Sequence, residues 1–215
     1  MNFLPRPLGP GRPKDPEKRA AILEAAKDLF TTRGYDAVSM DAIAQAAGVS
    51  KLTVYSHFQD KETLFQEAVK AKCEEQLPHE IFVARSGSVR EQILAIARAF
   101  VGLISSPEAL ALHRTMMAEA RSPSPLSRLF YEAGPKRTLD ELETFLRDRQ
   151  AAGELDISDC HRAAGHFFNL LKGESHMRLL IGCCDSVSPE ENEAHIASVV
   201  DLFLRAYAPR SERPA

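Results

Sequence analysis

Residues 48–65 read GVSKLTVYSHFQDKETLF and contain a short helical segment between two capping residues. A Gly-Val pair makes a tight turn, after which Ser50 can cap one helix and Asp60 the next. Upstream, Ser39 can cap a further short helix that leads into the same turn. Two short helices joined by a turn with glycine form a helix-turn-helix, so this stretch predicts that motif.

The second helix of this motif, around residues 51–58, has two faces that differ in chemistry. Val54 and Phe58 lie four residues apart and can pack on apolar side chains of the preceding helices. Several of the remaining side chains donate hydrogen bonds of the kind that reach phosphates and base edges in a major groove. A solvated surface helix has the same pattern, so chemistry alone leaves both interpretations open. The residues of this second face are Lys51, Leu52, Thr53, Tyr55, Ser56 and His57.

Helical periodicity extends along the chain, and proline and glycine divide it. The first helix is expected to begin near Asp15 and to end at Gly34. Residues 81–83 are the only β-like run and are too short to found a sheet. The sequence therefore predicts an all-α fold, in which Gly134-Pro135 separates two helices. The helices expected beyond the motif cover roughly 88–105, 107–121, 124–133, 135–152, 158–183 and 189–208.

Composition and charge exclude few classes of protein. The 215 residues are 44% hydrophobic and 27% charged, as in ordinary soluble globular proteins. No apolar run approaches the roughly 20 residues that span a bilayer, and the N-terminal residues lack the apolar core of a secretory signal. We therefore expect a cytoplasmic protein with no membrane partner. Residues 1–72 carry 11 Lys and Arg against 9 Asp and Glu, which agrees in sign with a nucleic-acid-facing N-terminal part.

A resemblance to a known family covers residues 17–69, which read EKRAAILEAAKDLFTTRGYDAVSMDAIAQAAGVSKLTVYSHFQDKETLFQEAV. The LF…RG ending of the first helix, the AGVS turn, the Y.HF helix and the KE.LF segment follow in this order. In these motifs the stretch resembles the DNA-binding domain of the TetR/AcrR family of bacterial regulators. The resemblance implies a double-stranded DNA operator as partner. The DNA-binding residues expected in this stretch are Ser39, Ser50, Lys51, Leu52, Thr53, Tyr55, Ser56, His57 and Lys61.

The expected roles within this set differ. Thr53 is the expected base contact, whereas Tyr55, His57 and Lys61 are expected to contact the DNA backbone. Leu52 stands where many members of the family have Gly or another small or polar residue. A leucine forms no hydrogen bond, but it can touch a thymine methyl group. The operator sequence of any other member therefore cannot be transferred to this chain.

The resemblance and the helix pattern together divide the chain into four parts. Arg12 and Lys14, near the N-terminus, are further DNA-binding candidates, since similar arms enter a neighbouring minor groove. A solvated tail is the alternative for this segment. The expected parts are a flexible basic arm at 1–14, a three-helix helix-turn-helix DNA-binding domain at 15–62, a larger C-terminal helical domain for effector binding and dimerisation at 63–209, and a disordered tail at 210–215.

Residues 116–156 are similar to the C-terminal domain of AefR-like members of this family. The similarity implies a homodimer formed through the last two helices and a pocket for a small effector. Independently, residues 163–181 carry apolar side chains on more than one face, so that helix needs cover on two sides. Either the last helices complete a monomer core or they pair with a second copy. A two-fold DNA site favours a homodimer through residues 158–183 and 189–208.

The candidate pocket residues combine apolar side chains with two polar ones. Met and Phe adapt to varied apolar ligands, and His113 and Asn169 can orient an apolar or amphipathic effector. The same residue types also make up a plain hydrophobic core, so both interpretations stay open. The effector-binding set is Phe100, His113, Met116, Met117, Phe130, Phe145, Phe167 and Asn169.

Common motifs of catalysis and cofactor binding do not occur in the sequence, which lacks G-x-S-x-G, a P-loop, H-E-x-x-H and a Gly-rich dinucleotide turn. We therefore expect no enzyme, no cofactor and no metal site. The expected function is a sequence-specific transcriptional regulator, a repressor that a small-molecule effector releases from a palindromic operator. Two alternatives stay open: a thiol-redox-responsive regulator that uses Cys183 and Cys184, and a non-specific DNA-binding protein.

Overall fold

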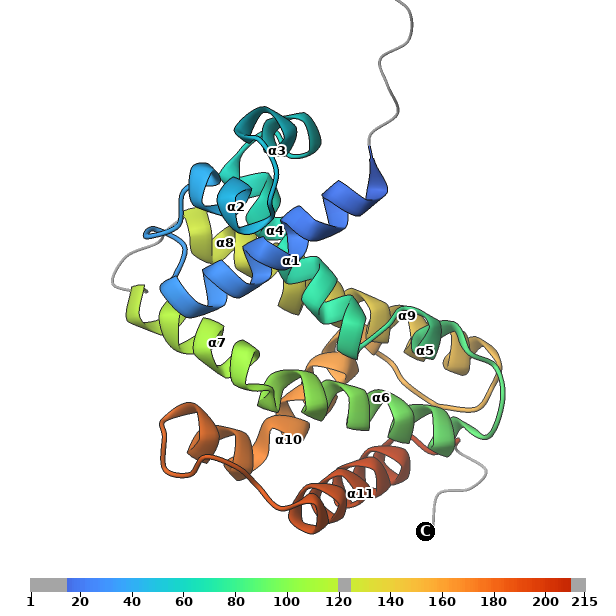
Figure 1. The fold of residues 1–215 in the computed structure, drawn as a ribbon. Helices are drawn as coiled ribbons and strands as arrows, with labels where there is room; N and C mark the ends of the chain where they lie inside the picture. Colours follow the sequence, from blue (N-terminus) through green and yellow to red (C-terminus); the bar gives the residue numbers. More distant parts are fainter. Residues whose placement is uncertain (1–14, 120–124, 210–215) are drawn as a thin grey trace, which may run out of the picture.

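Helices form every regular element of the computed structural model within the residues it describes, 15–119 and 125–209 (Figure 1). The all-α prediction is confirmed, and the β-like run at 81–83 lies in a short helix. The predicted arm at 1–14 and tail at 210–215 lie outside the described residues. The elements are α1 Pro16–Arg33, α2 Met40–Ala46, α3 Lys51–His57, α4 Lys61–Gln76, α5 Glu80–Val83, α6 Val89–Ser105, α7 Pro107–Glu119, α8 Pro125–Tyr131, η1 Glu132–Lys136, α9 Arg137–Ala151, α10 Cys160–Leu180 and α11 Pro189–Ala206.

The helix ends around the helix-turn-helix agree with those expected from the sequence. The side chains of Asp15, Ser39, Ser50 and Asp60 each accept a backbone N–H in the first turn of the helix that follows. Gly34 ends α1 with a φ of 76°, a backbone conformation that favours glycine. All of these contacts are local in the chain, which is why the sequence alone could place the helices.

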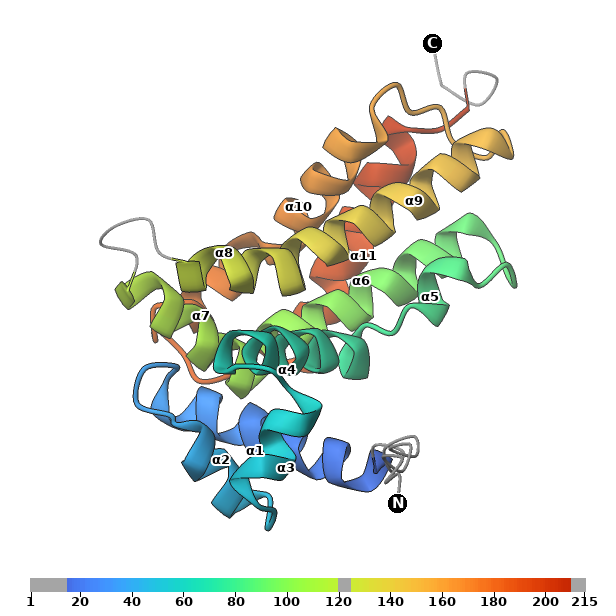
Figure 2. The same cartoon turned by 90° about the horizontal axis from the view of Figure 1, so that it is seen from above.

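Two hydrophobic cores organise the described part of the chain, and α4 connects them. The first core joins α1, α2, α3 and the first half of α4 with Met116 of α7 and Leu126 of α8. The second core is built mainly from α6, α9, α10 and α11, and Leu77 at the end of α4 belongs to it. Cys73 of α4 packs against both cores. Figures 1 and 2 show α4 between the N-terminal helices and the rest of the molecule.

The apolar helices α6 and α7 contribute to these two cores. Phe100 of α6 is buried in the second core and Met116 of α7 in the first. Within the described ranges, no helix is both long and apolar enough to cross a membrane by itself. Only α6 and α7 taken together, with a bend of 62° between them, meet that criterion of length and composition.

Gly134 and Pro135 do not separate two helices, as the sequence predicted, because α8, η1 and α9 follow one another without a break. Proline has no N–H, so an α-helix through this point would lack one hydrogen bond. The chain instead widens into the π-helical turn η1, and the hydroxyl of Thr138 donates to the Gly134 carbonyl at 3.1 Å. A Cβ on Gly134 would lie 3.2 Å from Val69, so the glycine also allows close approach of α4.

The segment expected as one helix over 158–183 is bent within α10, because Gly173 has a φ of 52° and a ψ of −162°. His195 of α11 lies against the bend, and its Nε2 donates to the carbonyls of Leu170 and Leu171 at 3.1 and 3.2 Å. A Cβ on Gly173 would lie 2.8 Å from the His195 ring. Both the backbone conformation and the available space therefore favour glycine at this position.

Candidate functional site

The helix α3 presents one face to the first core and the other face to solvent. Val54 is fully buried, Phe58 is 1% exposed, and the guanidinium of Arg19 lies 5.1 Å from the centroid of the Phe58 ring. Leu52, in contrast, is 80% exposed and Tyr55 is 43% exposed. The core contacts hold the helix in place and leave the opposite face exposed.

Hydroxyl groups at the start of α3 bond to one another and to the helix backbone. The Oγ of Ser50 accepts the N–H of Thr53 at 3.1 Å and lies 2.8 Å from the Oγ1 of Thr53. The Oγ of Ser56 donates to the Thr53 carbonyl at 2.7 Å. The Thr53 side chain is thereby positioned at the N-terminal end of α3, the part of a recognition helix that contacts base edges.

Lys51 has a partner on the neighbouring helix. Its Nζ lies 2.9 Å from the carboxylate of Asp41 in α2, and this hydrogen bond raises the pKa of Lys51. The two side chains are 58% and 63% exposed, so the pair contributes little to stability. Ser39, which caps α2, is also exposed.

His57 and Lys61 lie where α3 passes into α4. The Nζ of Lys61, the first residue of α4, lies 4.0 Å from the centroid of the Tyr35 ring. Asp60 accepts the N–H of Thr63 at 2.7 Å, so a carboxylate already occupies the N-terminus of this helix. The Nδ1 of His57 is buried and has no hydrogen-bond partner among the described residues.

The described DNA-binding residues expected from the sequence thus come from the caps of α2 and α3, from α3 itself and from the first residue of α4. Arg12 and Lys14 lie outside the described residues. The sequence did not indicate Tyr35 or Asp41, whose contacts position Lys61 and Lys51. No local pattern signals these contacts, because they depend on how α2, α3 and α4 cross.

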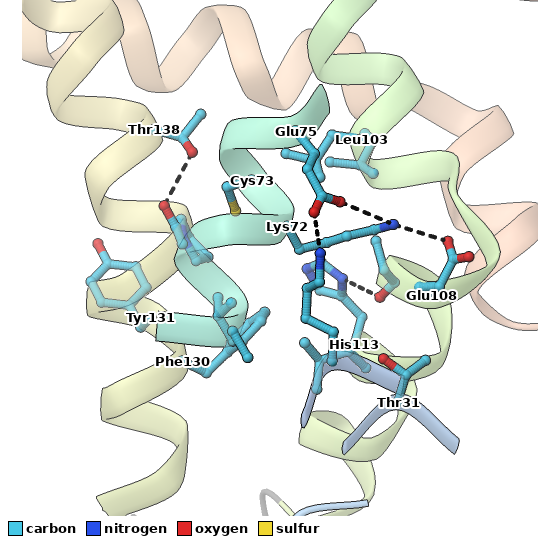
Figure 3. Close-up of a pocket in the computed structure, with 18 of the residues that line it drawn as sticks. Thr31, Lys72, Cys73, Glu75, Leu103, Glu108, His113, Phe130, Tyr131 and Thr138 are labelled. Atoms are coloured by element: carbon cyan, nitrogen blue, oxygen red, sulfur yellow. Dashed lines mark hydrogen bonds and ion pairs between the residues drawn. The ribbon is translucent and has the colours of Figure 1, made fainter. Parts of the chain in front are cut away.

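A cavity of about 640 Å³ lies beside α4, in the range of small-molecule sites (Figure 3). Residues of both cores line it, since Phe65 and Val69 belong to the first core and Leu103 and Ile104 to the second. Its wall includes residues of α1, α4, α6, α7, α8, η1, α9 and α10. The aromatic side chains of the wall are Phe30, Phe65, Phe100, Phe130, Tyr131 and Phe168.

Of the effector-binding residues expected from the sequence, Phe100, His113, Phe130 and Asn169 line this cavity. The other four do not line it, for reasons that lie in helix packing. Met116 is buried in the first core, whereas the side chain of Met117 is 60% exposed to solvent. Phe145 and Phe167 are buried in the second core instead. The lining residues missed from the sequence include Lys72, Cys73, Thr138 and Phe168.

Charged side chains form a chain of ion pairs at the cavity. Lys27 of α1 bonds the carboxylate of Glu75 in α4 and lies 2.6 Å from Glu24 of its own helix. Lys72 of α4 lies 3.9 Å from Glu75 and 3.7 Å from Glu108 of α7. Figure 3 marks both ion pairs with dashed lines. This series of ion pairs therefore connects α1, α4 and α7, and all five of its residues line the cavity.

The cysteines form no disulfide and belong to no metal-ligating cluster in the parts of the chain that the structure covers. Cys73, Cys160, Cys183 and Cys184 are all free, and no group of three metal-ligating side chains occurs in residues 15–119 and 125–209. Burial raises the pKa of Cys73 to about 11, so the thiol in the cavity wall stays protonated at neutral pH. The redox alternative for Cys183 and Cys184 stays a prediction.

Known proteins with the same architecture were found by sequence and by structure. Residues 22–68 match the family model of bacterial regulatory proteins of the tetR family, and residues 91–209 match the AefR-like transcriptional repressor C-terminal domain. A TetR-family transcriptional regulator from Mesorhizobium loti MAFF303099 gives a TM-score of 0.75 at 30% identity, covering 90% of this chain and 98% of its own. The Flavonoid-responsive Regulator FrrA gives a TM-score of 0.71 at 35% identity, and the match covers 91% of this chain and 100% of the FrrA chain. The HTH-type transcriptional regulator YdeS of Bacillus subtilis is 26% identical over 200 residues, 92% of this chain and 91% of that protein.

Proposed function

This chain belongs to the TetR family of bacterial DNA-binding transcriptional regulators, and on that premise we propose that it is a homodimeric repressor released from a palindromic operator by a small molecule. The match to a repressor C-terminal domain supports repression. The observation that carries the proposal is the position of α4. This helix begins next to α3 and contributes Val69, Lys72 and Cys73 to the cavity wall.

In this proposal α3 enters the major groove with its N-terminal end toward the bases. Thr53 contacts a base edge, and the exposed Leu52 contacts a thymine methyl group. Tyr55, His57 and Lys61 contact phosphates and set the register of the helix. Ser39, Ser50, Lys51 and Ser56 add contacts along the same surface.

The dimer forms through α10 and α11, where apolar side chains remain uncovered in the single chain. Leu170, Met177, Ile181 and Leu202 are each at least 40% exposed on this part of the surface. Such side chains favour a partner surface of the same kind, and a two-fold axis places one recognition helix at each half-site. A shallow depression between these helices, lined by His166, Asn169, Leu170, Leu202, Phe203, Ala206 and Tyr207, receives side chains of the second copy.

The effector acts by moving α4 relative to α1 and α7. A ligand in the cavity presses on the wall that α4 forms and disturbs the ion pairs of Lys72 and Glu75 with their neighbours. Because α4 continues from α3, its movement changes the distance between the two recognition helices. Half-sites about 34–36 Å apart, or a multiple of that distance, then no longer fit the dimer.

The effector itself is an apolar or amphipathic molecule. The aromatic wall of the cavity supports this class, and the similar regulator FrrA is named for its response to flavonoids. Aromatic compounds are therefore the first class to screen against this protein.

Selection from a random duplex library at about 150 mM salt tests the proposal, with the bound DNA sequenced afterwards. We expect enrichment of a two-fold-symmetric motif by a dimer, whose mass is measured by light scattering. Enrichment of a single asymmetric site by a monomer would contradict the proposal that a homodimer binds the operator. Retention of operator in the presence of every compound shown to bind would contradict release by an effector.

A further inference from the structure

The effector cavity proposed above contains a histidine whose hydrogen-bonding state follows from its neighbours. His113 lines the cavity, and its Nδ1 lies 2.8 Å from the carbonyl oxygen of Ala109, one turn earlier in α7 (Figure 3). A carbonyl oxygen only accepts hydrogen bonds, so Nδ1 carries the proton and donates it. In the neutral imidazole, Nε2 is then an acceptor.

The surroundings of His113 keep its imidazole neutral. Burial lowers the pKa of His113, opposed in part by the bond to Ala109, and the ammonium group of Lys172 lowers it further. The ring stands edge-on to Phe130, with 5.3 Å between centroids, and 6.2 Å from the ring of His176. Burial also lowers the pKa of His176, to about 4, so this neighbour is neutral as well. Both rings are therefore uncharged at neutral pH.

The Nε2 of His113 accepts no hydrogen bond from residues 15–119 or 125–209, whose only bond to this ring is at Nδ1. Two other polar side chains of the wall, Thr138 and Lys72, have partners of their own. The hydroxyl of Thr138 donates to a backbone carbonyl, and Lys72 lies between the carboxylates of Glu75 and Glu108. An O–H or N–H on the ligand would therefore satisfy an acceptor that the described residues leave unpaired.

The wall around this acceptor is aromatic. Phe100 and Phe168 stack with 4.1 Å between their centroids, and Phe130 contacts the His113 ring. The flexible methionines that the sequence suggested for this site do not line it. Aromatic ligands pack well against such rings through offset or edge-on contacts, whereas flexible alkyl chains gain more from adaptable methionines.

We infer that the effector is an aromatic molecule with a hydroxyl group, and that this hydroxyl donates a hydrogen bond to the Nε2 of His113. This inference rests on the proposed effector role of the cavity and adds the chemical class of the ligand. A carboxylate, the competing class, has no proton to donate at neutral pH and would set its oxygens against the lone pair of Nε2. The cavity volume of about 640 Å³ accommodates a ligand of several rings.

Calorimetric titration of the full chain with three naphthalene derivatives tests this inference at neutral pH. β-Naphthol can donate a hydrogen bond, its methyl ether cannot, and β-naphthoate represents the carboxylates. We expect β-naphthol to bind about tenfold more tightly than the methyl ether, because the ether leaves the acceptor unpaired. In His113→Phe the ratio should fall to about one. The control His79→Phe changes an exposed histidine outside the cavity and should keep the ratio.

Three results would overturn the inference: equal binding of β-naphthol and its methyl ether, tighter binding of β-naphthoate, or no binding of any probe at about millimolar concentration. Each is read on the unaltered protein, so a His113→Phe variant that fails to fold does not affect the decision. Retention of the tenfold ratio in a folded His113→Phe protein would overturn it too.

Release of the selected operator is measured separately, in the same preparation. Binding with the expected ratio but without release would contradict the effector role of the cavity and leave the His113 contact standing. Release by another class of compound, with no β-naphthol binding, would support the effector role and overturn the ligand class.

Discussion

The ammonium group of Lys27 in α1 bonds the carboxylate of Glu75 in α4, which lies 48 residues later in the chain. The Lys27 side chain is only 13% exposed, and a second carboxylate from Glu24 lies 2.6 Å away. This contact joins α1, which belongs to the first core, to α4, which connects the two cores, and both helices line the cavity.

Glu75→Gln should weaken the coupling between effector and operator more than it weakens the fold. Because Glu75 is 44% exposed, we expect the free energy of unfolding to fall by no more than about 1 kcal/mol. The effector concentration for half-release should change several-fold, since the link between α1 and α4 is lost. Glu24→Gln is the matched control, because it leaves the contact between helices in place. Equal changes in both variants would contradict a coupling role for Glu75.

Substitutions on α3 should separate base reading from phosphate binding. Thr53→Ala and Leu52→Ala should change the preferred bases, each by about 1–3 kcal/mol of discrimination. Lys61→Ala should weaken binding to all sequences and reduce the salt slope by about 0.9. Tyr55→Phe should weaken all sequences similarly with little change of slope, because it removes no charge. Titrations on two operator variants at several salt concentrations make these comparisons, and uniform losses for all four variants would mean that the base-reading face is assigned wrongly.

Leu202→Glu should convert the proposed dimer into a monomer. A carboxylate at this exposed position of α11 would have to be desolvated against the second copy. We expect the mass from light scattering to halve and the affinity for a palindromic operator to fall at least tenfold. Val83→Glu serves as control, since Val83 is also exposed but lies on α5, away from α10 and α11. If the Leu202→Glu variant remained a dimer, the dimer interface would not include Leu202.

Gly173→Ala should destabilise the protein by roughly 1–3 kcal/mol. The added Cβ would meet the His195 ring at 2.8 Å, and the φ of 52° is unfavourable for alanine. Gly102→Ala in α6 is the matched control, because nothing lies within 4 Å of its Cβ and helix propensity should raise stability by about 0.5–1 kcal/mol. Urea unfolding of both variants decides, and a neutral effect at Gly173 would show that the bend in α10 relaxes freely.

The stability of the fold should decrease as the pH falls from about 6.5 towards about 4, before most carboxylates are protonated. Burial holds the pKa of His176 at about 4 against an ordinary 6.5, so in this window the unfolded chain binds a proton that the folded protein does not. The loss amounts to about 3 kcal/mol over the whole window at most, and the lowered pKa of His113 acts in the same direction. Urea unfolding at several pH values should show a shallower dependence in His176→Leu. The same slope in that variant would contradict the assignment.

Local contacts made the helix ends and the buried face of α3 predictable from the sequence. The caps at Ser39, Ser50 and Asp60 bond to backbone groups in the next turn, so residue type and spacing predicted the helix ends and the helix-turn-helix. The alternation of Val54 and Phe58 with polar side chains likewise indicated which side of α3 is buried. Gly134-Pro135 shows the limit of such reasoning. The glycine and proline predicted a break between two helices. Packing against α4 and the hydrogen bond from the Thr138 hydroxyl to the Gly134 carbonyl instead keep the helix continuous.

The sequence by itself determined the all-α fold and the buried face of α3, because hydrogen bonds within a turn and the period of a helix are local properties. Only the tertiary structure decided which residues form the cavity. Phe167 and Phe168 are neighbours of identical chemistry, yet Phe167 packs on Phe203 in the core while Phe168 stacks on Phe100 in the cavity wall. The direction of each ring depends on how α10 lies against α6 and α11, and contacts between segments so far apart in the chain leave no pattern in the local sequence.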